Sequence, residues 1–201
     1  MAKKVRLGLI GASVRGTWSS RSHLPAVQAS AEVELTAVCT TRADSAEAAR
    51  QAYGARLAFH DYRAMVASPE IDAVAVVVRV PSHYEPTKAA LAAGKHVYCE
   101  WPLGRTTAEA VELTALAKDR GLVTAIGLQA RVNPAMMHMR ELVAAGYVGE
   151  IMAVHVCLMR EGVLTRPSNR TWQRDVTLGA NTLTIANGHT CLLYTSPSPR
   201  D

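Results

Sequence analysis

The sequence lacks three features, and each absence argues against a class of protein. No apolar run reaches the roughly 20 residues that a membrane-spanning helix needs, so no membrane partner is predicted. The Lys and Arg residues give a net charge of +5 but are scattered, without a basic run interleaved with aromatics, so nucleic-acid binding is not expected. No metal site is predicted from the pattern of possible ligands.

Paired cysteine spacing is also absent. Cys39, Cys99 and Cys157 each lie in or beside an apolar run, and they are not spaced as partners. Reduced, half-buried thiols in a cytoplasmic protein are therefore the predicted state. The start, MAKKVRLGLIGAS, has a basic end and an apolar stretch that is too short for a signal peptide, so we expect a first strand there.

Strand-like and helix-like segments alternate up to residue 126. Strands are predicted at 5–10, 33–39, 57–59, 73–78, 96–99 and 123–126. Helices are predicted at 44–53 with Asp44 as cap, 61–67, 86–94 and 106–120 with Thr106 as cap. The run AVAVVV does not alternate with polar residues, which is typical of a strand buried on both faces. The pattern predicts an α/β fold, a Rossmann-type doubly wound parallel sheet.

The rhythm changes after residue 126. NPAMMHMRELVAAGYVGEI predicts a helix ended by glycine, and IMAVHVCLM, residues 151–159, predicts a strand. We interpret 127–190 as the start of a second, α+β domain for substrate binding and oligomerisation. The last eleven residues, 191–201, read CLLYTSPSPRD, which a common transposase sequencing adapter encodes residue for residue. We expect a non-native tail on a truncated chain, with a natural Ser/Pro tail as the alternative.

A glycine loop follows the first predicted strand. In GLIGASVRG, Gly11, Ser13 and Gly16 take the positions of G-x-G-x-x-G, with serine in the middle. Between a strand and a helix, such a loop lets a diphosphate approach backbone amides at the helix start. We therefore predict that residues 1–126 bind a dinucleotide, with Ala12 also at the diphosphate; turn-forming glycines are the alternative.

The end of the second predicted strand bears on which cofactor is bound. It reads Cys39-Thr40-Thr41-Arg42, with no carboxylate before Asp44. NAD-binding proteins often place an acidic residue here, whereas hydroxyls and a guanidinium suit a 2′-phosphate. We predict that Thr40, Thr41 and Arg42 bind the cofactor and that NADP is preferred over NAD, with a merely solvated Arg42 as the alternative.

Three longer motifs carry a family resemblance. ALAAGKHVYCEWPLG, GLQARVNPAMMHMRELVAAGYVGEI and GANTLTIANGH together resemble the Gfo/Idh/MocA family of NAD(P)-dependent oxidoreductases, over residues 3–190. The spacing of Gly11, Trp18, His23 and Pro25 is most similar to the branch that contains the yeast galactose-regulon repressor, a dinucleotide-binding regulator. The resemblance implies hydride transfer on a sugar, polyol or related carbonyl compound, and a homo-oligomeric full-length parent.

The resemblance also implies site residues. It puts His83, Glu100, Trp101 and Gln129 on the cofactor, Arg131 in the substrate pocket and His189 at the catalytic histidine. The family's lysine is Trp101 here and its aspartate is Ile185, and indole cannot transfer a proton near neutral pH. A redox-inactive regulator therefore stays open as the alternative function. His83 has helix capping as its alternative, and His23 is expected to be structural.

Overall fold

The computed structural model describes residues 3–15, 18–155, 157, 172–173, 175–179, 184–185 and 188–191. The chain divides into two compact units, residues 1–127 and 128–201. Within the part that the structure describes, no helix combines the length and the apolar character needed to cross a lipid bilayer.

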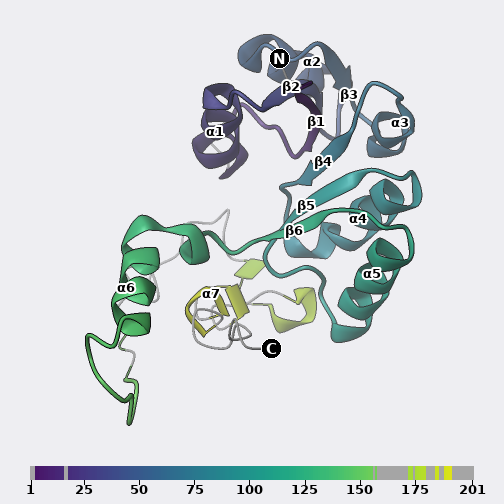
Figure 1. Ribbon diagram of the computed structural model, residues 1–201. Coiled ribbons are helices and arrows are strands. Elements are labelled where there is room, and N and C mark those ends of the chain that lie inside the picture. Colours follow the sequence, from purple (N-terminus) through teal and green to yellow (C-terminus); the bar gives the residue numbers. More distant parts are fainter. Residues whose placement is uncertain are drawn as a thin grey trace. The chain divides into compact units, whose positions relative to one another are not determined.

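The first unit is built on one six-stranded parallel sheet in the order β3-β2-β1-β4-β5-β6 (Figure 1). Its strands are β1 (Val5–Ile10), β2 (Val33–Cys39), β3 (Leu57–Phe59), β4 (Ala73–Val76), β5 (His96–Glu100) and β6 (Thr124–Gly127). The chain runs outward from β1 to β3, returns to β4 beside β1, and then runs outward to β6. This is a doubly wound sheet, and the Rossmann-type prediction is confirmed.

Helices cover both faces of this sheet because its central strands are apolar on both sides. One face carries α1 (Leu24–Ala29), which continues a π-helical turn η1 (Ser19–His23), and α2 (Ala43–Tyr53). The other carries α3 (Tyr62–Ala67), α4 (Tyr84–Ala92) and α5 (Thr107–Asp119). Alternate residues of β4 are buried on opposite faces. Val74 and Val76 pack in the hydrophobic cluster on the side of α3, α4 and α5, and Ala75 packs in the cluster on the side of α1 and α2, as the unbroken apolar run predicts.

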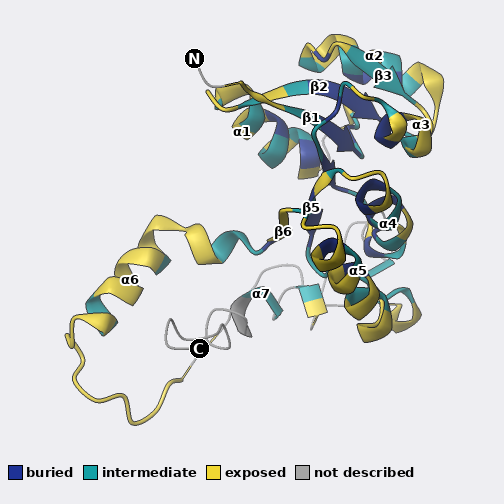
Figure 2. Ribbon diagram, turned by 45° about the vertical axis from the view of Figure 1, so that its right-hand side comes forward, coloured by how far each residue is buried: buried dark blue, intermediate teal, exposed yellow. Residues whose placement is uncertain are grey.

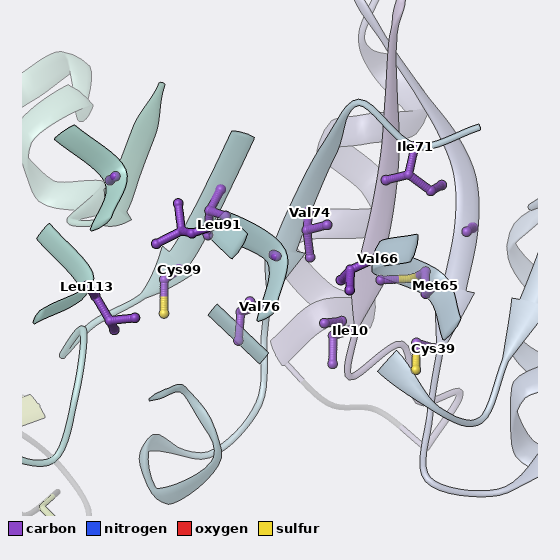
Figure 3. Packing of buried hydrophobic residues seen from close by; sticks show 14 residues of the cluster. Ile10, Cys39, Met65, Val66, Ile71, Val74, Val76, Leu91, Cys99 and Leu113 are labelled. Atoms are coloured by element: carbon purple, nitrogen blue, oxygen red, sulfur yellow. The ribbon is translucent and has the colours of Figure 1, made fainter. Parts of the chain in front are cut away.

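The larger of the two clusters lies under α3, α4 and α5. Figure 3 shows its side chains meeting between these helices and the strands, among them Met65, Leu91, Cys99 and Leu113. Met65 also limits β1: a Cβ added at Gly8 would lie 3.0 Å from both the sulfur and the terminal methyl of Met65. Gly8 is therefore a packing glycine whose neighbour is a flexible side chain.

Two helix starts test the capping predictions differently. Thr106 caps α5, since its hydroxyl accepts the Glu109 N–H at 3.2 Å. The prediction that Asp44 caps α2 is wrong, because the helix begins at Ala43 and the cap position is Arg42. Asp44 lies inside the first turn, where its carboxylate accepts from the Arg42 guanidinium and from the Ser45 backbone N–H.

The second unit contains η3 (Gln129–Val132), α6 (Pro134–Ala144), η5 (Val176–Leu178) and α7 (Gly188–Cys191). Asn133 caps α6 by accepting the Ala135 N–H at 3.0 Å, and the helix stops before Gly146, whose φ is +80°. α6 has no buried residue, and its ribbon in Figure 2 is mostly yellow, for exposed residues, with some teal.

The strand predicted at 151–159 is wrong where the structure describes it. Residues 151–155 are exposed and form no regular element. A strand needs a neighbour for its backbone hydrogen bonds, and the described residues of this unit include no strand that could supply one. Most of the predicted tail, residues 192–201, lies outside the described part.

The buried thiols lead to a labelling prediction. Burial raises the pKa of Cys39 and of Cys99 to about 12, whereas Cys157 is exposed. Thiols with so high a pKa are almost entirely protonated at pH 8, so iodoacetamide should modify Cys157 and spare Cys39 and Cys99. Peptide mass mapping of the native chain measures this. Labelling of Cys39 or Cys99 at the rate of Cys157 would contradict the packing described above.

Candidate nucleotide-binding site

Gly11 lies where the strand order of the sheet reverses. It directly follows β1, whose neighbour β4 leads the chain to the opposite side of the sheet. Its φ is +93°, and a Cβ there would lie 2.1 Å from the Val77 carbonyl oxygen and 3.0 Å from a methyl of Val78. Glycine alone meets both the backbone conformation and the close approach. Doubly wound sheets bind ligands in the crevice at this reversal point.

The loop after β1 is shaped by its own hydrogen bonds. The Gly11 N–H donates to the Cys39 carbonyl at 2.9 Å, and the Ser13 N–H donates to the Gly11 carbonyl at 2.9 Å. The Tyr53 hydroxyl, from the end of α2, donates to the Ser13 carbonyl at 3.0 Å. Ala12 is fully buried and its N–H also points at the Cys39 carbonyl. These residues therefore give the loop its shape, while Gly16 lies outside the described residues.

The residues predicted to recognise the ribose follow β2. The Arg42 guanidinium donates to both carboxylate oxygens of Asp44, at 3.0 and 2.9 Å, and lowers the pKa of that carboxyl. The Thr40 hydroxyl bonds the Arg42 carbonyl and the Ser45 hydroxyl. Thr41 is exposed. The Arg42 side chain is 61% exposed, so a phosphate can reach it, but Asp44 already shares its charge.

A buried carboxylate ends β5. Three side chains converge on Oε1 of Glu100: His23 Nε2 at 2.5 Å, the Trp18 indole N–H at 3.2 Å and the Tyr98 hydroxyl at 3.2 Å. His23 also packs edge-on against the rings of Trp18 and Tyr98. Glu100 itself is 9% exposed.

The surroundings of Glu100 keep it ionised. Burial raises the pKa of Glu100. The hydrogen bonds from His23, Trp18 and Tyr98 lower it by more than burial raises it, so the pKa lies below its ordinary value. Gly127, at the end of β6, leaves room for this cluster. A Cβ there would lie 2.6 Å from the Tyr98 hydroxyl oxygen and 2.9 Å from Glu100 Oε2.

His83 is 1% exposed and lies between the two segments that follow the carboxyl ends of β4 and β5. Its Nδ1 lies 2.7 Å from the Pro102 carbonyl oxygen, after β5, and its Nε2 lies 3.1 Å from the Val78 carbonyl oxygen, after β4. Burial lowers the pKa of His83, although both carbonyls and Glu100 act to raise it. The alternative prediction, that the His83 side chain caps a helix, is wrong, because this side chain makes no capping hydrogen bond at the start of α4.

Trp101 directly follows Glu100 and is half-buried, and the Trp101–Pro102 peptide bond is cis.

In the second unit, Gln129 and Arg131 lie on η3, and α7, which holds His189, lies beside η3. His189 and Ile185 are half-buried. Within the described ranges, no three His, Cys, Asp or Glu side chains gather as a metal site.

Sequence reasoning did not foresee the Glu100 cluster. It expected His23 to be structural but named no partner for it, and it gave Trp18 and Tyr98 no role at Glu100. The signal for Tyr98 was its position two residues before Glu100, since alternate residues of a strand share a face. The signal for His23 was its fixed spacing after Gly11 together with Trp18, which indicated a defined loop but not its partner on β5.

Comparison with known proteins gives a family match. The family described as "Oxidoreductase family, NAD-binding Rossmann fold" matches residues 5–128. Among curated proteins, the "Dehydrogenase aclE" of Aspergillus oryzae is 32% identical over 195 residues, which cover 94% of this chain and 53% of that protein. The galactose/lactose metabolism regulatory protein GAL80 of Saccharomyces cerevisiae is 27% identical over 164 residues, covering 77% of this chain and 38% of that protein.

A solved structure shares the same arrangement. KijD10, a 3-ketoreductase from Actinomadura kijaniata in complex with NADP and TDP-benzene, superposes with a TM-score of 0.66 and 30% identity, over 74% of this chain and 44% of that one. This chain thus spans about half the length, or less, of the relatives it matches.

Proposed function

The chain belongs to the Gfo/Idh/MocA oxidoreductase family, whose fold is an NAD-binding Rossmann fold, and from this we propose that it binds a nicotinamide dinucleotide and serves hydride transfer on a sugar, polyol or related carbonyl compound. The observation that carries the proposal is Gly11, held at the reversal point of the sheet where a Cβ would meet the Val77 carbonyl. A loop of that shape admits a diphosphate close to the backbone.

The proposal assigns roles to the residues of both units. A nicotinamide dinucleotide held by these residues would supply the hydride donor or acceptor. We propose that the loop from Gly11 to Gly16 takes the diphosphate, with Thr40, Thr41 and Arg42 on the ribose. We propose His83, Trp101 and Gln129 on the nicotinamide side, Arg131 for the substrate, and His189 for the proton.

Nucleotide binding is tested by tryptophan fluorescence. NADPH and NADH are titrated into the 201-residue chain. We expect saturable quenching with a dissociation constant in the range of about 1–100 μM. Titration calorimetry in the same buffer is the second measurement. Absence of both quenching and heat with either nucleotide would refute the proposal.

A regulator that binds the dinucleotide without turnover is the second candidate function. Trp101 stands where the family has its lysine, and the chain resembles the regulatory protein GAL80 over 77% of its length. Indole offers no titratable group for the proton. The deciding assay is turnover of a panel of sugars and polyols by the wild type and by Trp101→Lys. Turnover near ordinary enzymatic rates in the wild type, about 1–1000 per second, excludes the regulator.

Cofactor preference depends on the Arg42–Asp44 pair. We propose that NADP is preferred, because the exposed Arg42 guanidinium can bind a 2′-phosphate once its ion pair with Asp44 is broken. Replacing Asp44 with Asn removes the competing charge and should tighten NADPH binding about threefold, in line with exposed ion pairs, without changing NADH binding. Glu47→Gln on the same helix is the control, since its partners are Arg50 and Gln51. An equal gain for both nucleotides would argue against the 2′-phosphate role.

Several expectations stay predictions from the sequence. They are the cytoplasmic location, a homo-oligomeric state, the absence of nucleic-acid binding, and the division into a nucleotide-binding domain at 1–126 and a partial second domain at 127–190. Size-exclusion chromatography with light scattering measures the oligomeric state directly.

A further inference from the structure

A hydrogen-bonded link joins the chain after the glycine loop to the end of β5. Its members are Trp18 and His23, at the two ends of the turn that follows the loop, and Tyr98 and Glu100 on β5. We call this set of contacts the Glu100 link. In the sheet, β4 lies between β1 and β5, so the link joins the segment that follows β1 to a strand that does not pair with β1.

The glycine loop is held from both sides. The Ser19 hydroxyl, fully buried beside Trp18, donates to the Gly11 carbonyl at 2.7 Å and so closes the loop on itself. Tyr53 fixes Ser13 from the α2 side. The Glu100 link fixes the downstream end, at Trp18 and His23, from the β5 side. The segment that follows the glycine loop is therefore hydrogen-bonded to a carboxylate from a distant strand.

Glu100 Oε1 is fully engaged by these contacts. It accepts from Trp18, His23 and Tyr98, and Oε2 packs against Gly127, where a Cβ would come within 2.9 Å. For Oε1 to bind a ligand, Glu100 would have to release the two residues that fix the loop. Hydrogen bonds to a charged, buried acceptor are among the stronger ones in proteins.

We propose that Glu100 is a positioning residue for the glycine loop: through Trp18 and His23 it holds the loop that begins at Gly11 in the shape that accepts the diphosphate. This inference rests on the proposed nucleotide binding. It differs from the role implied by family resemblance, in which Glu100 lies beside the nicotinamide. The two roles make opposite predictions for a ligand that carries the diphosphate but lacks the nicotinamide.

The experiment compares NADH with ADP-ribose, which lacks only the nicotinamide, by titration calorimetry on the 201-residue chain. In Glu100→Ala the acceptor is gone, and we expect both ligands to bind more weakly by the same factor, about tenfold or more from the loss of several hydrogen bonds. Glu100→Gln keeps an acceptor oxygen and should recover most of the affinity for both ligands. Glu85→Gln, at an exposed position of α4, is the control and should match the wild type.

Trp18→Phe is a second variant, for which we expect a smaller loss of affinity. It keeps an aromatic ring but lacks the N–H that reaches Glu100, so both ligands should weaken by about threefold, the value of one hydrogen bond. Circular dichroism melting confirms that each variant is folded, and Trp18→Phe decides the question if Glu100→Ala unfolds.

Two results would overturn the inference. A loss confined to NADH would mean that Glu100 touches the nicotinamide half and does not position the loop. Unchanged binding of both ligands in Glu100→Ala and Trp18→Phe would mean that the link is dispensable. If the wild type binds neither ligand, the proposed function fails and this inference fails with it; wild-type binding with unaffected variants removes the inference alone.

Discussion

Gly11→Ala should lose nucleotide binding by more than about a hundredfold, which corresponds to nearly 3 kcal/mol of binding free energy. The new Cβ would lie 2.1 Å from the Val77 carbonyl oxygen, and alanine would have to hold a φ of +93°. The left-handed conformation costs roughly 1–2 kcal/mol, and overpacking a tight site costs roughly 1–3 kcal/mol more. The loop must move away from the sheet to relieve both, and the diphosphate crevice changes with it.

The measurements are an NADPH titration and a thermal melt, each set against Gly54→Ala. Gly54 also has a positive φ, of +69°, but nothing lies within 4 Å of its added Cβ. That control should lose about 1 kcal/mol of unfolding free energy and keep its nucleotide affinity. A Gly11→Ala variant that binds NADPH within threefold of the wild type would disprove the role of the close approach.

Leu113→Ala should lower the unfolding free energy by about 2–5 kcal/mol, the range for truncating a buried leucine. Leu113 is 1% exposed, and with Ala117 it forms the buried stripe by which α5 packs on the sheet (Figure 3). For a chain of this size the melting temperature should fall by about 10 °C. Nucleotide affinity, measured below the melt, should change little, because Leu113 lies in the cluster beneath the helices and not at the loop.

The matched control is Val111→Ala on the same helix. Val111 is 63% exposed, so its truncation leaves no cavity, and its effect should stay within about 0.5 kcal/mol. Equal destabilisation by the two variants would mean that α5 does not pack through the stripe described here. Differential scanning fluorimetry of both variants in parallel makes the comparison.

Local patterns were sufficient for most of the first unit. β1, β2 and β3 have the bounds predicted from their apolar runs, and β4 is buried on both faces, as the lack of polar alternation in AVAVVV indicates. These elements are encoded within a few residues, so neighbouring side chains decide them. The Asp44 cap failed at the same local scale because the helix begins one residue earlier, at Ala43, which puts Asp44 inside the first turn with its carboxylate on the Arg42 guanidinium.

Contacts between distant segments were harder to foresee. Trp18 and His23 meet Glu100 across 82 and 77 residues of chain, and their meeting depends on β4 pairing between β1 and β5. The strand predicted at 151–159 has the right composition, but composition cannot supply a neighbouring strand. The candidate site was therefore located from the glycine loop, whereas the partners of Glu100 emerged from the topology.

The two glycines of β1 and its following loop should have different evolutionary histories. At Gly8 the obstacle to a larger residue is the flexible end of Met65, so a shorter side chain at 65 makes room, and the two positions are expected to covary among descendants of this sequence. At Gly11 the obstacle is main chain, which every substitution at Val77 retains. A selection for second-site suppressors should therefore rescue Gly8→Ala readily and leave Gly11→Ala without any single compensating change.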